Sequence, residues 1–279
     1  MIVTRFAPSP SGLLHLGHAW SALQGWRRAQ AGGRFLLRIE DIDQGRCRPE
    51  YDAAILEDMA WLGLDWSNGV RRQSEHFGDY RAALARLQET SLVYPCFCTR
   101  KQIEAEIAAS AAAPHGPLGL IYPGTCRALS REERAARLIA GEDHAWRLDA
   151  AGAAAIAGPL HWREDGKGTV AVDPLIGGDV VLARKDAPVS YHLAVVHDDA
   201  LQGITLVTRG EDLFHATHIH RLLQALLGYP APDYAHHGLL VGPDGKRFAK
   251  RDRSLTIAAL REAGRTPAEV IAMAQAMAG

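Results

Sequence analysis

The sequence RFAPSPSGLLHLGHA occupies residues 5–19 and follows directly on a short apolar run that predicts a strand over residues 2–6. After the loop, which is rich in proline, serine and glycine, the pattern predicts a helix over residues 19–31 that ends at Gly32-Gly33. Residues 34–40 then predict a second strand. A strand, a helix and a further strand in this order are typical of a parallel sheet, so the sequence indicates an α/β fold.

The loop and the first helical turn suggest a site for a phosphate. His15-Leu16-Gly17-His18 opens the helix, and a helix N-terminus offers unpaired N–H groups to an anion. Gly12 and Gly17 let a ligand approach the backbone. The two imidazoles, three residues apart, lie on the same side of the turn and can donate hydrogen bonds to a phosphoryl oxygen. The alternative is an ordinary helix cap.

The remainder of the chain continues the α/β pattern around a compositional break. Helices are predicted over residues 49–62, 74–90 and 213–227, and strands over residues 180–183, 193–196, 204–208 and 238–241. The break begins at Tyr94 and leads into a segment rich in Ala, Pro and Gly. We therefore expect a core of residues 1–95 and 180–254, an inserted domain of residues 96–179, and a helical tail of residues 255–279. No internal repeat is found.

Composition restricts the class of protein. The chain has 279 residues, 47% of them hydrophobic, with 31 Lys and Arg against 32 Asp and Glu. This balance of charge argues against a polybasic binding strategy. The length and the hydrophobic fraction permit a sizeable core. Neither a membrane-spanning run nor a signal peptide is recognised, so no membrane association is predicted. The four cysteines are too few to stabilise such a chain by disulfides. We therefore expect free thiols and a location in the reducing cytoplasm.

Two further clusters carry possible chemistry. GPDGKRFAKRDRS at residues 242–254 is a basic loop that can bind a polyphosphate, unless it is only a solvated run of charge. Cys96, Cys98 and Cys126 supply three thiolates for a tetrahedral Zn²⁺, with His115 as a candidate fourth ligand. Buried, inert cysteines are the alternative.

The stretch RFAPSPSGLLHLGHA resembles the first signature of class I aminoacyl-tRNA synthetases, in the form used by the glutamyl and glutaminyl branch. The resemblance implies a Rossmann-like core, with a parallel sheet covered by helices on both faces and split by an insert. Residues 247–251, RFAKR, stand in the place of the second signature, in which Lys250 keeps its identity and Arg247 replaces a lysine. His15, Gly17, His18, Arg247 and Lys250 are thereby implied to bind ATP with its Mg²⁺, and His15, His18 and Lys250 to act in catalysis.

The same resemblance implies a pocket for glutamate made of Arg5, Ser9, Glu40, Tyr191 and Arg209. The substrate carries two carboxylates and one ammonium group, so its pocket needs about two cationic groups and one buried acid. Which arginine binds which carboxylate stays open.

Glu40 and Arg209 in this set also have alternative roles. The carboxylates of Glu40, Asp41 and Asp43 can cap a loop or bind Mg²⁺. Arg209 can form an ion pair with the acidic residues 211–212.

The pattern YPCFCTR…IYPGTCR resembles a glutamyl-synthetase-like family in which a tyrosine completes the zinc site. The residue in that position is Tyr122, four residues before Cys126. The resemblance therefore implies one structural Zn²⁺ per chain, bound by Cys96, Cys98, Tyr122 and Cys126.

Only 29 residues follow Lys250, too few for an anticodon-binding domain, so we expect none. An ordinary glutamyl-tRNA synthetase would continue with such a domain. In this respect the sequence resembles the glutamyl-Q tRNA(Asp) synthetases, which activate glutamate with ATP and attach it to the queuosine base of tRNA(Asp). A monomer that binds ATP, L-glutamate and this tRNA is expected. Three alternatives stay open: a minimal glutamyl-tRNA synthetase that charges a tRNA 3′ end, a small-molecule nucleotidyltransferase, and a catalytically inactive tRNA-binding module.

Overall fold

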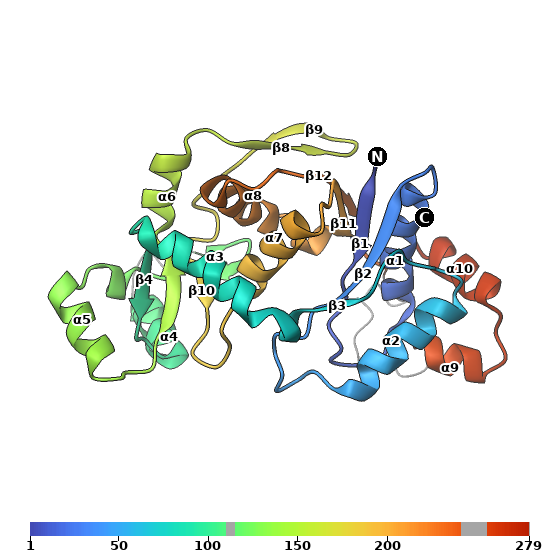
Figure 1. Cartoon of the computed structure of the whole chain (residues 1–279), viewed down its shortest axis with the longest axis horizontal. Coiled ribbons are helices and arrows are strands. Elements are labelled where there is room, and N and C mark those ends of the chain that lie inside the picture. Colours follow the sequence, from blue (N-terminus) through green and yellow to red (C-terminus); the bar gives the residue numbers. More distant parts are fainter. Residues whose placement is uncertain (110–114, 241–255, 279) are drawn as a thin grey trace.

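Two groups of parallel strands from opposite parts of the chain lie side by side, and together they are called the central sheet here (Figure 1). The computed structural model describes residues 1–109, 115–240 and 256–278. The strands of this sheet are β1 (Val3–Phe6), β2 (Arg34–Ile39), β3 (Arg71–Arg72), β11 (Leu206–Gly210) and β12 (Asp233–His237). β1, β2 and β3 pair in parallel, as do β11 and β12.

The two groups of strands meet where β1 lies beside β11. The amide of Thr205 donates to the carbonyl of Val3 at 3.0 Å, and Nη1 of Arg5 donates to the carbonyl of Thr208 at 3.2 Å. The contacts advance along both segments together, so β1 and β11 run in the same direction. Their carboxyl ends therefore lie at one edge of the sheet, the usual position of a ligand site in such folds.

Helix α1 (Leu16–Ala29) connects β1 to β2 and packs closely against the sheet. A Cβ atom at Gly25 would lie 2.9 Å from Oγ1 of Thr208, so glycine permits this approach. The apolar core on this side also includes α2 (Pro49–Trp61), α9 (Ile257–Glu262) and α10 (Pro267–Ala276). These helices surround the sheet at one end of the elongated molecule (Figure 1).

A second core lies around an antiparallel sheet of β4 (Val93–Cys96), β7 (Ala145–Leu148) and β10 (Val181–Ala183). The helices that pack there are α3 (Phe77–Glu89), α6 (Ala150–Ala157), α7 (Tyr191–Leu201) and α8 (Ala216–Leu227). Beyond this sheet lie α4 (Arg100–Ala109), α5 (Arg131–Ile139) and the short pair β5 (His115–Gly116) and β6 (Gly119–Leu120). Figure 1 shows α4 and α5 at the end of the molecule opposite α1.

A hairpin of β8 (His161–Glu164) and β9 (Gly168–Ala171) extends the central sheet. β8 pairs with β12 in parallel, with Glu164 opposite Tyr234. Trp162 is buried in a small core together with Val3 and Tyr234. Residues between β4 and β10 thus pair with β12 and extend the sheet beyond it.

The predicted α/β fold with a parallel sheet is confirmed. The strand predicted over residues 193–196 is wrong, because these residues lie in α7. All of them are buried, and a short helix segment that is apolar on every side cannot be told from a strand by its pattern. The strand predicted over residues 238–241 is also misplaced, because the strand there is β12, immediately before it; Val241 lies outside the described residues.

The predicted divisions after residues 95, 179 and 254 stay predictions. β4 and β10 lie close to the first two of these positions. In the parts of the chain that the structure describes, no helix is long and apolar enough to cross a membrane.

Candidate active site

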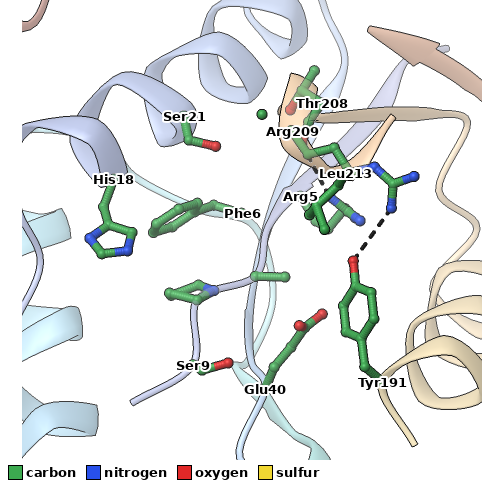
Figure 2. A pocket seen from close by; sticks show the side chains of 13 residues that line it. Arg5, Phe6, Ser9, His18, Ser21, Glu40, Tyr191, Thr208, Arg209 and Leu213 are labelled. Atoms are coloured by element: carbon green, nitrogen blue, oxygen red, sulfur yellow. Dashed lines mark hydrogen bonds between the residues drawn. The ribbon is translucent and has the colours of Figure 1, made fainter. Parts of the chain in front are cut away.

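A cavity of about 300 Å³ opens at the carboxyl edge of β1, β2 and β11 (Figure 2). All of the residues predicted for the glutamate pocket line it. They are Arg5 of β1, Ser9 of the loop that follows, Glu40 after β2, Tyr191 at the start of α7, and Arg209 of β11. The structure therefore brings together residues that lie more than 200 positions apart in the chain.

One wall of the cavity is stabilised by ion pairs. Arg5 donates from Nε to Oδ1 of Asp199 at 3.0 Å, and the fully buried Arg38 also donates to this carboxylate. Burial alone would raise the pKa of Asp199, but the two guanidinium groups hold it below its ordinary value. Asp199 thus fixes Arg5 at the cavity wall and balances part of its charge.

The adjacent Asp198 anchors the elements behind this wall. Its carboxylate accepts hydrogen bonds from Arg71 Nε at 2.8 Å, Gln73 Nε2 at 2.9 Å and the Tyr80 hydroxyl at 2.8 Å. A buried carboxylate with three donors is well satisfied. Asp198 therefore connects α7 to β3, to α3 and to the turn between them.

Glu40 is the acid of the cavity. Burial raises its pKa to about 7, against the opposing charges of Arg38 and Arg5. Arg38 Nη1 lies 3.7 Å from Oε1 of Glu40. A carboxyl group with this pKa gains a proton near neutrality unless a further cation binds beside it.

Arg209, on the neighbouring strand β11, lines the cavity beside Arg5 (Figure 2). It donates from Nε to His236 Nε2 at 3.1 Å and from Nη2 to Thr217 Oγ1 at 2.7 Å. Its Nη1 lies 3.1 Å from His220 Nδ1 and 3.4 Å from the Tyr191 hydroxyl. Within the described residues these partners include no carboxylate, so the structure does not support the alternative ion pair with residues 211–212.

The neighbouring acids Asp41 and Asp43 have structural partners. Asp41 accepts from the amide and the hydroxyl of Ser74 at 2.8 and 2.6 Å. Asp43 forms ion pairs with Arg46 and Arg184, which hold its pKa below the ordinary value. The alternative that these acids cap and brace a loop is therefore favoured over a magnesium site.

The two histidines of the first motif adopt a defined geometry at the start of α1. Nδ1 of His15 accepts from the amide of Gly17, and Nδ1 of His18 accepts from the amide of His15, both at 3.1 Å. An imidazole that accepts at Nδ1 in its neutral form carries its proton on Nε2. A Cβ atom at Gly17 would lie 3.0 Å from the His15 ring, so glycine also keeps space for this cap.

A second cavity, of about 280 Å³, lies against these histidines and is lined by His15, Gly17 and His18. It shares His18, Ser21 and Gly210 with the first cavity. The two cavities thus adjoin, as a site for two reactants requires.

Arg247 and Lys250 lie outside the described residues. Leu240 and Thr256 are the described residues on either side of residues 241–255. Leu240 lines the second cavity, and Thr256 forms a β-bridge with His15, which also lines it. The amide of Ile257 also donates to the carbonyl of Leu14 at 2.9 Å.

Far from these cavities, three thiols converge. The Sγ atoms of Cys96, Cys98 and Cys126 all lie within 4.8 Å of one another, close enough to bind one metal ion. The Tyr122 hydroxyl lies 3.6 Å from Cys98 Sγ and accepts from the Cys126 amide at 2.8 Å. The side chain of His115, the other predicted ligand, lies outside the described part of the structure.

Sequence reasoning missed the residues that support the cavity walls, chiefly Asp199, Arg38, His220 and His236. The stretch SYHLAVVHDD contains the signal for the first of these, since Asp198-Asp199 in an apolar helix predicts buried charge that needs arginine partners. The sequence around His236 contains no comparable signal.

Nearly the whole chain matches a known family and several relatives. The model for the class I tRNA synthetases (E and Q), catalytic domain, matches residues 1–277. A Glutamyl-Q tRNA(Asp) synthetase of Rhodobacter capsulatus is 49% identical over 96% of this chain and 98% of its own length. One of Symbiobacterium thermophilum is 46% identical over 97% of this chain and 84% of its own.

A solved structure has the same fold. The glutamate tRNA ligase from Elizabethkingia meningosepticum, crystallised with its amino acid, superposes with a TM-score of 0.74 at 29% identity. The match covers 90% of this chain and 52% of that protein, so this chain spans about half its length.

Proposed function

Because this chain belongs to the class I aminoacyl-tRNA synthetases of the glutamate and glutamine group, which are ligases, we propose that it activates L-glutamate with ATP. The observation that carries the proposal is the cavity at the sheet edge, in which two arginines and one acid face a volume of about 300 Å³. Glutamate, with two carboxylates and one ammonium group, matches this set of charges.

The walls suggest how the substrate lies. Arg209, whose partners among the described residues are uncharged, has a positive charge available for a substrate carboxylate. Arg5 shares its charge with Asp199 and would take the other carboxylate. Glu40 would bind the ammonium group, with Ser9 and Tyr191 completing the cavity as hydroxyl partners.

ATP would bind in the adjoining cavity at the N-terminus of α1, beside Gly17. Mg²⁺ would enter with the ATP phosphates. An oxygen of the α-carboxylate attacks the α-phosphorus, and the bond to pyrophosphate breaks, which gives glutamyl-adenylate. His15 and His18 would donate from Nε2 to the phosphoryl oxygens as charge builds up, and Arg247 and Lys250 would bind the polyphosphate.

The acceptor that we propose is the queuosine base of tRNA(Asp). A hydroxyl of its ring attacks the activated carbonyl of the adenylate and AMP leaves. Support for this acceptor comes from the names of relatives that are 46% and 49% identical. The likeness to a glutamate tRNA ligase keeps charging of a tRNA 3′ end as the second candidate.

We also propose that Cys96, Cys98, Cys126 and Tyr122 hold one structural Zn²⁺. Three thiolates and one oxygen ligand are a suitable donor set for a closed tetrahedral site. The ion would connect β4 to the segment that contains Cys126, where the apolar cluster is small.

The test is transfer of labelled glutamate, with ATP, to total tRNA from queuosine-producing cells and from cells unable to make queuosine. Label in the first pool alone supports the proposed acceptor. Equal label in both pools would make this a minimal glutamyl-tRNA synthetase. If neither pool is labelled and no glutamate-dependent ATP–pyrophosphate exchange occurs, the proposed activation is wrong.

A further inference from the structure

Arg209 is held by neutral side chains on three elements. Thr217 and His220 belong to α8, His236 to β12 and Tyr191 to α7. Four of the five guanidinium N–H groups are engaged in this way, and the longest of these contacts, 3.4 Å, joins Nη1 to the Tyr191 hydroxyl across the cavity (Figure 2). The orientation of this cation therefore depends on each partner presenting a lone pair and not a proton.

For His236, that condition is set by Glu164. The imidazole Nδ1 lies 2.9 Å from Oε2 of Glu164, and the backbone amide of His236 donates to Oε1, also at 2.9 Å. The side chains of both residues are 1% exposed, so water cannot replace either contact. A carboxylate only accepts, and Nδ1 must therefore carry the proton, which leaves Nε2 as an acceptor for the Nε–H group of Arg209 at 3.1 Å.

Burial and the nearby charge of Arg209 lower the pKa of His236 to about 4, so its ring is neutral near pH 7. The Glu164 carboxylate also accepts from Trp162 Nε1 at 3.1 Å. Three donors thus converge on two oxygens, and an amide in the same place would satisfy fewer of them.

We propose that Glu164 and His236 are positioning residues that fix the Arg209 guanidinium to receive the side-chain carboxylate of the amino acid. Neither residue lines the cavity, so neither touches the substrate. The negative charge of Glu164 is placed behind the imidazole, where it sets the tautomer without pairing directly with Arg209. The cation then keeps its charge for the ligand, which favours glutamate over the neutral glutamine. This inference rests on the proposed function and assigns part of its amino-acid selectivity to the hairpin of β8 and β9.

The test is steady-state ATP–pyrophosphate exchange, with tRNA present, of the whole protein and of Glu164→Gln. We expect the KM for glutamate to rise about tenfold, because one buried donor loses its acceptor and Arg209 shifts. The KM for ATP should stay within about twofold of wild type, and the preference for glutamate over glutamine should fall. A purely structural role would reduce the active fraction and leave both KM values unchanged, and that result would overturn the proposal.

The matched control is Asp165→Asn. This substitution removes a carboxylate from the adjacent position, where the side chain is exposed and paired with Arg28 at 2.8 Å. We expect its KM for glutamate to equal that of wild type. An equal rise in both variants would mean that net charge, and not the contact to His236, is responsible, and would overturn the proposal.

A second pair of variants applies even if Glu164→Gln does not fold. His236→Gln retains an oxygen that can accept from Arg209, whereas His236→Phe keeps a ring and removes both contacts. We expect the KM for glutamate to rise no more than about threefold in the first and tenfold or more in the second. Equal values in the two variants contradict the proposal. Failure of the wild-type protein to catalyse glutamate-dependent exchange is a separate result, which contradicts the proposed function itself.

Discussion

The cavity at the sheet edge and the thiol cluster both bury polar side chains, but they differ in what neutralises those side chains. In the cavity wall, Arg5 and Arg38 pair with Asp199, so buried charges of opposite sign partly neutralise one another. In the cluster, Cys96, Cys98 and Cys126 face one another, and within the described residues their sulfur atoms contact other thiols, a phenol and a backbone amide.

This difference separates a site that folding completes from a site that a ligand completes. Buried ion pairs need no outside group once their geometry is correct. A group of three thiols gains most from a metal ion, which draws off their protons and binds the thiolates. The cavity should therefore exist before any substrate binds, whereas the cluster should be well ordered only when it holds a metal ion.

The largest effect is expected from Arg209→Ala, which removes the cation whose partners are uncharged. The efficiency of glutamate-dependent ATP–pyrophosphate exchange should fall about a hundredfold or more, since a charge-assisted pair with the substrate is lost. Arg163→Ala, an exposed arginine of β8, is the control and should behave as wild type. Unchanged activation in Arg209→Ala would mean that the pocket is misassigned.

Asp199→Asn tests whether the buried ion pairs stabilise the cavity wall. It takes the shared counter-ion from two buried arginines, and the free energy of unfolding should fall by about 3 kcal/mol in urea titrations. Asp186→Asn breaks an exposed pair with Arg184 and should change stability by less than about 0.5 kcal/mol. If the two variants lose the same stability, the buried ion pairs do not stabilise this wall more than an exposed pair would.

Metal removal tests the other half of the comparison. The purified protein should carry close to one zinc per chain, and a strong chelator should increase proteolysis between Tyr94 and Cys126 while leaving the KM for glutamate within about twofold. Cys47→Ser, which changes a cysteine outside the cluster, should retain the metal. A metal-free preparation with three titratable thiols in a fully ordered cluster would contradict the zinc assignment.

The smallest effect is a dependence on pH that comes from Glu40. Burial raises its pKa to about 7, so below that pH the free protein must lose a proton before the ammonium group can bind. The KM for glutamate should therefore rise as the pH falls below about 7, by up to about tenfold per unit. In Glu40→Gln the KM should be high and nearly independent of pH; a profile like that of wild type would exclude Glu40 as the titrating group.

The same pKa sets the sign of a stability effect. The folded protein holds a proton on Glu40 that the unfolded chain releases near its ordinary pKa of 4.5. The contribution of this group to stability is thus complete below about pH 4.5 and is lost as the pH rises through about 7.

The sequence predicts the start of the fold well and its middle poorly. β1, α1 and β2 follow from a local pattern in which Pro8, Gln30 and Glu40 stand within two residues of the ends of these elements. The sequence predicts a strand for part of α7 because all four residues from 193 to 196 are apolar and buried, and burial on every side removes the periodicity that identifies a helix. The position of β8 beside β12 could not be predicted, because it depends on a long-range pairing.

The candidate site shows the same limit. The residues of the cavity surface, such as Arg5 and Glu40, stand next to recognisable motifs and could be named from the sequence. The residues behind them, such as Glu164 and His236, stand in no motif, and their importance follows only from contacts between distant segments. Their roles and those of the cavity residues stay predictions until the variants are measured.

The junction of β1 with β11 has a consequence for how the protein is made. Val3 bonds to a residue 202 positions later, and Arg5 pairs with one 194 positions later. During synthesis, β1 therefore cannot contact β11 until more than 200 residues have left the ribosome. Contacts of such long range slow folding and leave an apolar strand edge exposed in the meantime. We expect refolding to be slow, and nascent chains that end before residue 206 to depend on chaperones.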